Sequence, residues 1–438
     1  MDSIGSSFNE SIKNNGVLSQ VKTAYIAPPS PTLEINQDME LMSASGNAIY
    51  RLGFGGSPLP PCGELVKAYS ENLWSTSYPP IQGLYECRES IASFYQSQFS
   101  LDFQPEGIFV FPGSKEAIFQ ILSILEGPLL LPAPSWVSYA PQARMTGKEV
   151  HWIETKQENA YKLTPTALQA TSQKLSKGQK ILILNSPNNP VGHVYTEIEL
   201  RSLAEVCKEE NILVIFDAIY AHPRDFDAQV FKSMYEFYPE GCFFTGGLSK
   251  IFSCGGWRFG FVVLPQSDSS RLASALTYKM SETISGVNLP LQHAAIKAYQ
   301  CNEVVETYLN NVNRIYGFVT NYMRDRLIEM GLSCPKPSGA FYVFPSFDNF
   351  KNQLLEKQIH NSVDLAKFLK SMGIFVLPGL NFGLSKEELA IRISCTDFDG
   401  NDVFNELQDR TLEQISLKKF FPKIEGACDQ LNSFLQSL

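Results

Sequence analysis

The sequence predicts an α/β protein built on a mostly parallel sheet of seven strands, with helices on both faces and a smaller α+β domain beside it. Between about residues 105 and 265, short runs of Val, Ile, Leu and Phe alternate with longer helical patterns. Such continuous apolar runs are typical of parallel strands that are buried on both faces. The runs are Ile108–Phe111, Leu129–Leu131, Val150–Ile153, Ile181–Leu184, Ile212–Phe216, Cys242–Thr245 and Phe259–Leu264.

After about residue 310 the pattern becomes that of an α+β segment. We expect helices over 311–330 and 363–372, and strands over 340–345, 374–377 and 391–394. The predicted division of the chain is an N-terminal arm over 1–30, a large domain over 61–305, and a small domain formed by 31–60 with 306–438.

Composition and charge exclude several classes of protein. Lys and Arg total 36 against 45 for Asp and Glu, and the net charge of −9 offers no electrostatic footprint for nucleic acid or an anionic membrane. No apolar run approaches the roughly 18 residues that span a bilayer. The nine cysteines are scattered without a CxxC pair, so we expect no disulfide framework, no metal site and a reducing, cytoplasmic location. Small-molecule chemistry is the class that remains.

Parallel α/β sheets bind ligands beyond the carboxyl ends of their strands, so polar residues after each apolar run are candidate site residues. The first run is followed by Pro112 and then by Gly113, Ser114 and Lys115, a glycine turn that opens into a helix. Free backbone N–H groups at a helix N-terminus favour an anion, most often phosphate. Taken alone, the turn is explained equally well by Ser114 as an ordinary helix N-cap.

Two further strand ends carry polar side chains. Asp217 follows five apolar residues, so its carboxylate needs a cation or a donor, and Tyr220 stands three residues further on. A protonated pyridine nitrogen would be such a partner, although an isolated Asp at a strand end more often caps the next helix. The Pro- and Gly-rich loop 185–192 presents Asn189 at the same edge of the sheet.

The fourth strand end is a glycine-rich turn that contains Ser249 and Lys250, and Arg258 follows eight residues after the lysine. Most lysines in such turns are solvated, and Arg258 alone indicates no more than an ion pair. The coincidence of four strand ends changes this interpretation. Pyridoxal phosphate (PLP) needs an amine to form an imine, a carboxylate for its pyridine nitrogen, donors for its phenolate oxygen and an anion site for its phosphate. The sequence therefore predicts a PLP site.

From about Pro28 to the C-terminal helix, the chain resembles the fold-type I, class I aminotransferases in the order and spacing of separated motifs. These are Gly113-Ser114-Lys115, Asn189-Pro190-Val191-Gly192, Asp217-Ala218-Ile219-Tyr220, Ser249-Lys250, Gly256-Trp257-Arg258, Gly339-Ala340-Phe341-Tyr342 and Arg392-Ile393-Ser394. The resemblance implies that Lys250 holds PLP as a Schiff base. It further implies that Asp217 pairs with the pyridine nitrogen and that Asn189 and Tyr220 donate to the phenolate oxygen.

The same resemblance implies roles for the other cofactor residues. Arg258 and the N–H groups around Ser114 and Lys115, in the turn that starts at Gly113, are expected to bind the phosphate, and Trp136 to stack on the ring. Tyr78 matches a tyrosine that reaches the phosphate of the partner subunit, so a homodimer with shared sites is expected. Many members have a serine three residues before the lysine where this chain has Gly247, and we expect Ser249 or Thr245 to replace it.

The implied substrates are an amino acid and a 2-oxoacid, used in turn in a ping-pong scheme. Arg392 matches the arginine that binds the substrate α-carboxylate with its fork, alongside Gly55 and Asn189. In the bacterial-type aspartate and prephenate aminotransferases, residues that match Lys115 and Trp136 meet a distal carboxylate, so one substrate is expected to be dicarboxylic. The alternatives are a strand-end salt bridge for Arg392 and a solvated Lys115.

Two departures from the family pattern lie near the site entrance. Ala218 replaces a glutamate, and Gly55-Gly56-Ser57-Pro58 replaces the more usual Gly-Glu-Pro-Asp, so these departures bear on the identity of the substrate and not on the cofactor. Alternatives that share the cofactor residues are a lyase, either aminocyclopropane-carboxylate synthase-like or C–S lyase-like, and an aromatic or methionine-type aminotransferase. The effector-binding domain of a transcription regulator is disfavoured, because about 30 residues upstream are too few for a helix-turn-helix module.

Overall fold

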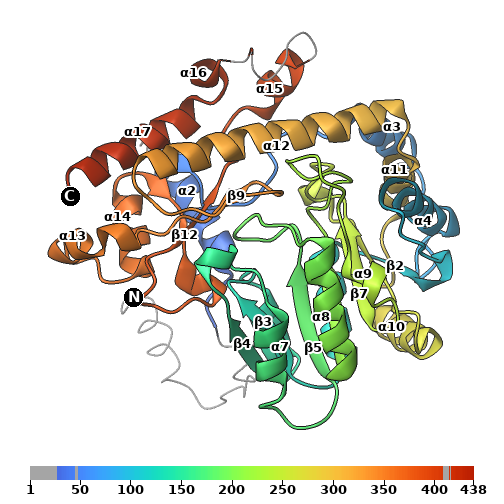
Figure 1. Ribbon diagram of the computed structural model, residues 1–438. Coiled ribbons are helices and arrows are strands. Elements are labelled where there is room, and N and C mark those ends of the chain that lie inside the picture. Colours follow the sequence, from blue (N-terminus) through green and yellow to red (C-terminus); the bar gives the residue numbers. More distant parts are fainter. Residues whose placement is uncertain (1–26, 45–47, 408–413, 415) are drawn as a thin grey trace, which may run out of the picture.

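The computed structural model describes residues 27–44, 48–407, 414 and 416–438, and a seven-stranded sheet lies at its centre (Figure 1). Only β8 is antiparallel to its neighbours, β2 and β7, among the paired strands of this sheet. Each expected apolar run overlaps one strand, which confirms the mostly parallel sheet. The strands in spatial order are β2 (Ile108–Phe111), β8 (Gly260–Val263), β7 (Cys242–Gly247), β6 (Ile212–Asp217), β5 (Lys180–Asn185), β3 (Leu129–Ala133) and β4 (Val150–Glu154).

Successive side chains of the central strands pack into two different cores, as expected for a sheet buried on both faces. Leu182 and Val214 belong to one cluster, which also contains Leu200 of α8 (Glu197–Glu209). Ile181 and Ile215 belong to the other, together with side chains of α5 (Ser114–Ile124) and α10 (Ser269–Thr283). Helices therefore cover both faces of the sheet (Figure 1).

Local sequence signals explain where α8 begins and which side it buries. Glu199 donates its backbone N–H to the Thr196 hydroxyl, and the Glu199 carboxylate accepts the backbone N–H of Thr196, which together form a capping box. Leu200, Leu203 and Cys207 then recur at helical spacing on the buried face.

The C-terminal part of the chain forms two small sheets beside a long helix, α12 (Glu303–Glu329). A three-stranded antiparallel sheet has the order β11 (Leu377–Pro378), β12 (Ile391–Ser394), β9 (Tyr342–Val343), and β1 (Tyr50–Arg51) pairs in parallel with β10 (Ile374–Phe375).

Three predicted bounds in this part need correction. The helix expected over 311–330 begins at Glu303, because the Asn302 side chain caps it by accepting the backbone N–H of Val305 at 3.0 Å. The strand expected over 340–345 is reduced to β9, which pairs with only two residues of β12. The strand expected over 374–377 is divided, because its first half pairs with β1 and its second half with β12.

The remaining helices enclose the sheets. They are α2 (Pro31–Ala44), α3 (Gly63–Glu71), α4 (Tyr85–Phe99), α6 (Tyr139–Met145), α7 (Pro165–Ser172), α9 (Met234–Phe237), α11 (Leu289–Gln300), α13 (Lys351–Glu356), α14 (Ser362–Ser371), α15 (Gly400–Glu406), α16 (Leu417–Phe420) and α17 (Pro422–Gln436). The helix expected over 363–372 corresponds to α14. The predicted arm lies outside the described residues except for 27–30, and no helix of the described part is long and apolar enough to cross a membrane.

Candidate active site

Lys250 lies in the turn after β7 and is partly buried. Its Nζ donates to the carbonyl oxygen of Gly55 at 2.6 Å and lies 5.6 Å from the ring centroids of both Tyr220 and Phe341. Burial, together with the positive charges of Arg392 and Arg258, lowers the pKa of Lys250 to about 8, against an opposing effect of Asp217. A substantial neutral fraction near pH 8 makes this amine a nucleophile.

Asp217 ends β6 and is only 3% exposed. The Tyr139 hydroxyl donates to its Oδ2 at 2.6 Å, while the Thr245 hydroxyl and the Ile219 N–H each donate to its Oδ1 at 3.2 Å. Burial raises the pKa of Asp217, and these donors oppose the rise. The alternative that Asp217 caps the next helix is wrong, because α9 begins at Met234 with its own N-cap.

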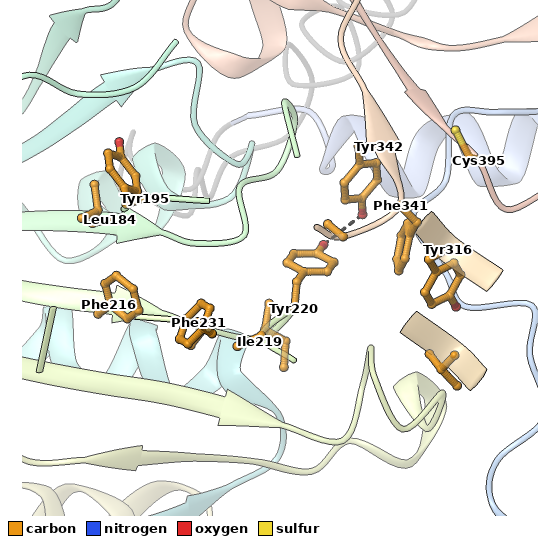
Figure 2. Packing of buried hydrophobic residues seen from close by; sticks show 14 of the residues in the cluster. Leu184, Tyr195, Phe216, Ile219, Tyr220, Phe231, Tyr316, Phe341, Tyr342 and Cys395 are labelled. Carbon is orange, nitrogen blue, oxygen red and sulfur yellow. Dashed lines mark hydrogen bonds between the residues drawn. The ribbon is translucent and has the colours of Figure 1, made fainter. Parts of the chain in front are cut away.

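A chain of hydrogen bonds joins Tyr220 to the opposite side of the site. The hydroxyls of Tyr220 and Tyr342 lie 2.9 Å apart, and Asn189 donates from Nδ2 to the Tyr220 oxygen at 3.3 Å. Figure 2 shows Tyr220 beyond the end of its strand, with its hydroxyl directed at Tyr342 and with Phe341 alongside. The predicted pair Asn189 and Tyr220 is therefore brought together, and Tyr342 joins it.

Arg392 of β12 is 1% exposed, yet no acidic side chain of the described residues lies within ion-pair distance of it. Its Nη1 donates to Asn189 Oδ1 at 3.1 Å, its Nη2 donates to the Gly53 carbonyl at 2.5 Å, and its buried Nε lacks a partner. The predicted alternative of a strand-end salt bridge is therefore wrong. A buried guanidinium with an unused donor fits an anionic ligand such as a carboxylate.

A second cationic part of the site, here called the glycine corner, lies at the start of α5 and is formed by Gly113, Ser114, Arg258 and Gly260. Gly113 has φ of +93°, and a Cβ there would lie 2.3 Å from Arg258 Nη2, while a Cβ on Gly260 would lie 2.2 Å from the backbone nitrogen of Ser114. Both glycines therefore keep this corner open. Within the described part of the chain, Arg258 donates only to backbone carbonyls. Ser114 is the first helical residue and Gly113 the N-cap, so the N-cap interpretation of Ser114 is wrong.

Lys115 and Trp136 also lie together. The Lys115 Nζ is 5.2 Å from the Trp136 ring centroid, and the Trp136 ring meets the edge of Tyr139 at 79°. Burial lowers the pKa of Lys115, with a further lowering by Arg258, so the ammonium is not simply solvated.

Thr245 and Ser249, the two candidates to replace the serine that many family members have at position 247, lie in different surroundings. Thr245 is turned toward Asp217, and Ser249 lies buried beside Lys250 in the turn. A Cβ at Gly247 would lie 2.5 Å from the Phe259 carbonyl oxygen, because Gly247 is paired with Gly260 across β7 and β8. A serine at position 247 would thus require the backbone to shift.

Tyr78 is the predicted site residue that this chain does not bring to the others. Its side chain is 90% exposed, and no hydrogen-bond partner occurs among the described residues. Its contact with a partner subunit stays a prediction.

Sequence reasoning missed Tyr139 as the donor to Asp217 and gave no role to Tyr342. Their contacts join residues 78 and 122 positions apart. Tyr342 stands in a motif that the sequence singled out, whereas no local pattern marks Tyr139.

Four cations face one carboxylate in this site. None of Lys115, Lys250, Arg258 and Arg392 forms an ion pair within the described part of the chain, and Asp217 is the buried acid among them. This excess of positive charge, the open glycine corner and the unpartnered Arg392 Nε fit a ligand that carries phosphate together with a carboxylate. The fold and the site together define a PLP-dependent enzyme of fold type I.

Comparison with known proteins agrees with this class. The model of the family "Aminotransferase class I and II" matches residues 53–404. The chain belongs to that family and is a PLP-dependent aminotransferase.

Named relatives cover most of the chain. It is 30% identical to the aspartate aminotransferase of Bacillus subtilis over 81% of this chain and 89% of that protein, and 32% identical, over the same shares, to a probable aspartate/prephenate aminotransferase of Aquifex aeolicus. The structure of the aspartate aminotransferase from Thermus thermophilus with maleate has the same fold, with a TM-score of 0.81 and 23% identity over 95% of this chain and all of that one.

Proposed function

We propose that this enzyme moves an amino group from an amino acid to a 2-oxoacid in two alternating half-reactions, and that one of the two substrates is dicarboxylic. The observation that carries the proposal is the set of four unpaired cations around Asp217. A phosphate and an α-carboxylate account for Arg258 and Arg392, and Lys115 remains for a distal carboxylate. The relatives named aspartate and aspartate/prephenate aminotransferases agree with this substrate class.

The proposed cofactor residues follow from the groups that meet at the strand ends. The phosphate would be held by Arg258, by the backbone N–H groups around Gly113, Ser114 and Lys115, and by Ser249, with Tyr78 of the partner subunit completing the site. Asp217 would bind the pyridine nitrogen, Asn189 and Tyr220 the phenolate oxygen, and Trp136 one ring face. When bound, PLP supplies an electron sink for the electron pair released at the substrate Cα.

Lys250 would hold the cofactor through its amine and, once displaced by the substrate amine, would take the proton from Cα of the amino acid in one half-reaction and give a proton to Cα of the second substrate in the other. A pKa lowered to about 8 suits both tasks, because the same group must be neutral to accept a proton and charged to return it. Tyr220 and Phe341, whose rings lie against Nζ, restrict where the amine can move.

Substrate orientation is assigned to the other cations. Arg392 would bind the α-carboxylate with its free donors, and the hydrogen bond from Nη1 to Asn189 fixes the plane of its fork. Gly55, whose carbonyl oxygen accepts from Lys250 Nζ, would contact the same carboxylate through its backbone N–H. Lys115, whose ammonium lies over the Trp136 ring, would bind the distal carboxylate.

A homodimer is proposed from the surface near Tyr78. Leu73, Trp74 and Tyr78 are 55%, 91% and 90% exposed, and large apolar side chains gathered on a surface mark an interface. A cytoplasmic location is proposed because all nine cysteines are free thiols. The division into a large domain over 61–305 and a small domain over 31–60 with 306–438 is proposed from the separate sheets of the two parts.

An aromatic aminotransferase is the second candidate. The structure of the aromatic aminotransferase from Pyrococcus horikoshii matches this chain with 27% identity and a TM-score of 0.75 over 92% of it. No observation favours the lyase alternatives.

The experiment is a panel of half-reactions in which single amino acids are mixed with the PLP-loaded enzyme and the conversion of PLP to pyridoxamine phosphate is followed by absorbance. Glutamate or aspartate should convert it at least tenfold faster than phenylalanine, tyrosine and methionine at equal concentration. Faster conversion by the aromatic amino acids would select the second candidate. Elimination products without pyridoxamine phosphate would select a lyase.

A further inference from the structure

Residues 51–57, here called the strap, begin at the last residue of β1, bend at Gly53 and cross the site. The carbonyls of Leu52 and Phe54 accept from the Ser394 N–H at 2.8 Å and from the Thr396 hydroxyl at 3.3 Å. The carbonyls of Gly53 and Gly55, which alternate with these in the sequence, have partners among the cations of the site. They accept from Arg392 Nη2 at 2.5 Å and from Lys250 Nζ at 2.6 Å. One strap therefore supplies an acceptor to each of the two central cations.

Ser57 joins the strap to the lysine turn through its side-chain hydroxyl. Its hydroxyl donates to the Ser253 hydroxyl at 2.8 Å and accepts from the Tyr316 hydroxyl at 2.5 Å. Ser253 in turn donates its backbone N–H to the Lys250 carbonyl at 3.0 Å. The three hydroxyls thus tie the strap, the lysine turn and α12 together, three parts of the chain that are distant in sequence.

The strap has little room to move sideways at Gly55. A Cβ on Gly55 would lie 1.9 Å from the Tyr342 hydroxyl oxygen, so the strap passes between Tyr342 and Lys250 in direct contact with both. A displacement at Ser57 would therefore be transmitted to the Gly55 and Gly53 carbonyls, since only one residue separates each from the next.

We propose that Ser57 is a positioning residue, which anchors the strap on Ser253 and Tyr316 and so holds the Gly55 carbonyl on the Lys250 amine and the Gly53 carbonyl on Arg392. The proposal rests on the proposed roles of Lys250 and Arg392, and it gives a function to the sequence Gly55-Gly56-Ser57-Pro58. Without this anchor, the amine and the guanidinium would lose fixed acceptors while the residues themselves stay in place.

The test compares Ser57→Ala with Ser57→Thr, which keeps the hydroxyl, and with Ser172→Ala. Ser172 is the control, because it is a buried serine whose hydroxyl also donates a hydrogen bond, to Glu210 at 2.8 Å. Ser172 is the last residue of α7, a helix that contributes no residue to the site. Two quantities are measured. The first is the rate at which a small amine-reactive reagent labels Lys250 in the cofactor-free protein between pH 6 and 10, measured by peptide mass spectrometry. The second is the pair of kinetic constants KM and kcat for glutamate.

Loss of a fixed acceptor disfavours the protonated amine, so Lys250 should be labelled about threefold faster or more at pH 7 in Ser57→Ala than in the wild type. Its KM should rise about fivefold or more with kcat within about twofold, because the Arg392 fork is less well oriented. Ser57→Thr should behave as the wild type. Ser57→Ala that matches Ser172→Ala in both quantities overturns the proposal.

If Ser57→Ala does not fold, Tyr316→Phe takes its place, since it removes one hydroxyl of the same set and keeps the ring. The same labelling change is then expected, and wild-type labelling would overturn the proposal. The labelling needs no cofactor, so it separates this proposal from the proposed function. A wild-type enzyme without transaminase activity would contradict the function and leave the labelling comparison valid.

Discussion

Tyr139 donates its hydroxyl hydrogen to Oδ2 of Asp217 at 2.6 Å, and both side chains are buried. The Asp217 carboxylate therefore reaches the site already oriented by a side chain of a different element, α6. A carboxylate held in this way needs no reorganisation when a cationic ring nitrogen arrives.

Tyr139→Phe should weaken PLP binding by about 10-fold or more, because a hydrogen bond to a charged group contributes roughly 1.5–3 kcal/mol. The lost donor also lets the pKa of Asp217 rise further. Tyr299→Phe is the matched control, since it removes a buried hydroxyl that has no hydrogen-bond partner. Dissociation constants for PLP from fluorescence titration provide the measurement. Equal affinity in the two variants would show that Tyr139 does not orient Asp217 for the cofactor.

Lys115→Met should lower kcat/KM for glutamate or aspartate by about 10-fold or more and leave apolar amino acids little changed, because one charge-assisted contact to the distal carboxylate is lost. Lys208→Met is the control, since Lys208 also lies over an aromatic ring, that of Tyr238 at 5.6 Å, outside the site. Steady-state kinetics with both substrate classes decide the matter. Equal losses for acidic and apolar substrates would assign Lys115 to the cofactor or the fold.

The lowered pKa of Lys250 makes the stability of the cofactor-free protein depend on pH. The folded pKa is about 8 and the unfolded value about 10.4, so the unfolded chain binds more protons between these values. The charged form of Lys250 therefore destabilises the folded protein. Between pH 8 and about 10.4 the free energy of unfolding rises with pH, by up to about 1.4 kcal/mol per pH unit. Lys250→Met should therefore be more stable than the wild type at pH 7, and the difference should shrink toward pH 10. Urea unfolding across this range, with Lys174→Met as an exposed control, gives the slopes. A difference that does not change with pH would refute the lowered pKa.

Shared sites predict complementation between subunits. A dimer of one Tyr78→Phe chain and one Lys250→Ala chain contains one site with both native residues, so its activity per intact site should return to the wild-type level. The two chains would carry different purification tags and be isolated as the mixed dimer. Activity no higher than half that of the Tyr78→Phe dimer, or an active monomer by light scattering, would contradict the shared site.

The sequence located the elements that are defined by their own composition. The apolar run over 108–111 predicted β2 with its observed bounds, and the strand expected over 391–394 coincides with β12. The residues after β2, β5, β6 and β7 do meet at one edge of the sheet. The two-residue strands β9, β10 and β11 were overestimated or merged, because their length depends on which partner strand lies beside them.

The parts of the site that escaped prediction depend on contacts between distant elements. Tyr139 acts on Asp217, and Ser57 meets Tyr316 across 259 residues of sequence. The sequence around a single tyrosine or serine contains no pattern that indicates such a distant partner. Lys250 could be proposed as the cofactor lysine because a glycine-rich turn and three other strand ends accompany it in sequence.

The central claim is that Lys250 holds the cofactor. The most direct test is to load the wild-type protein with PLP, reduce it with borohydride to fix the link between PLP and its lysine, digest it and locate the added mass by peptide sequencing. We expect a single modified peptide, with the mass on Lys250, and no modified peptide in Lys250→Ala treated in the same way. A pyridoxyl group on another lysine, or one retained in Lys250→Ala, would contradict it.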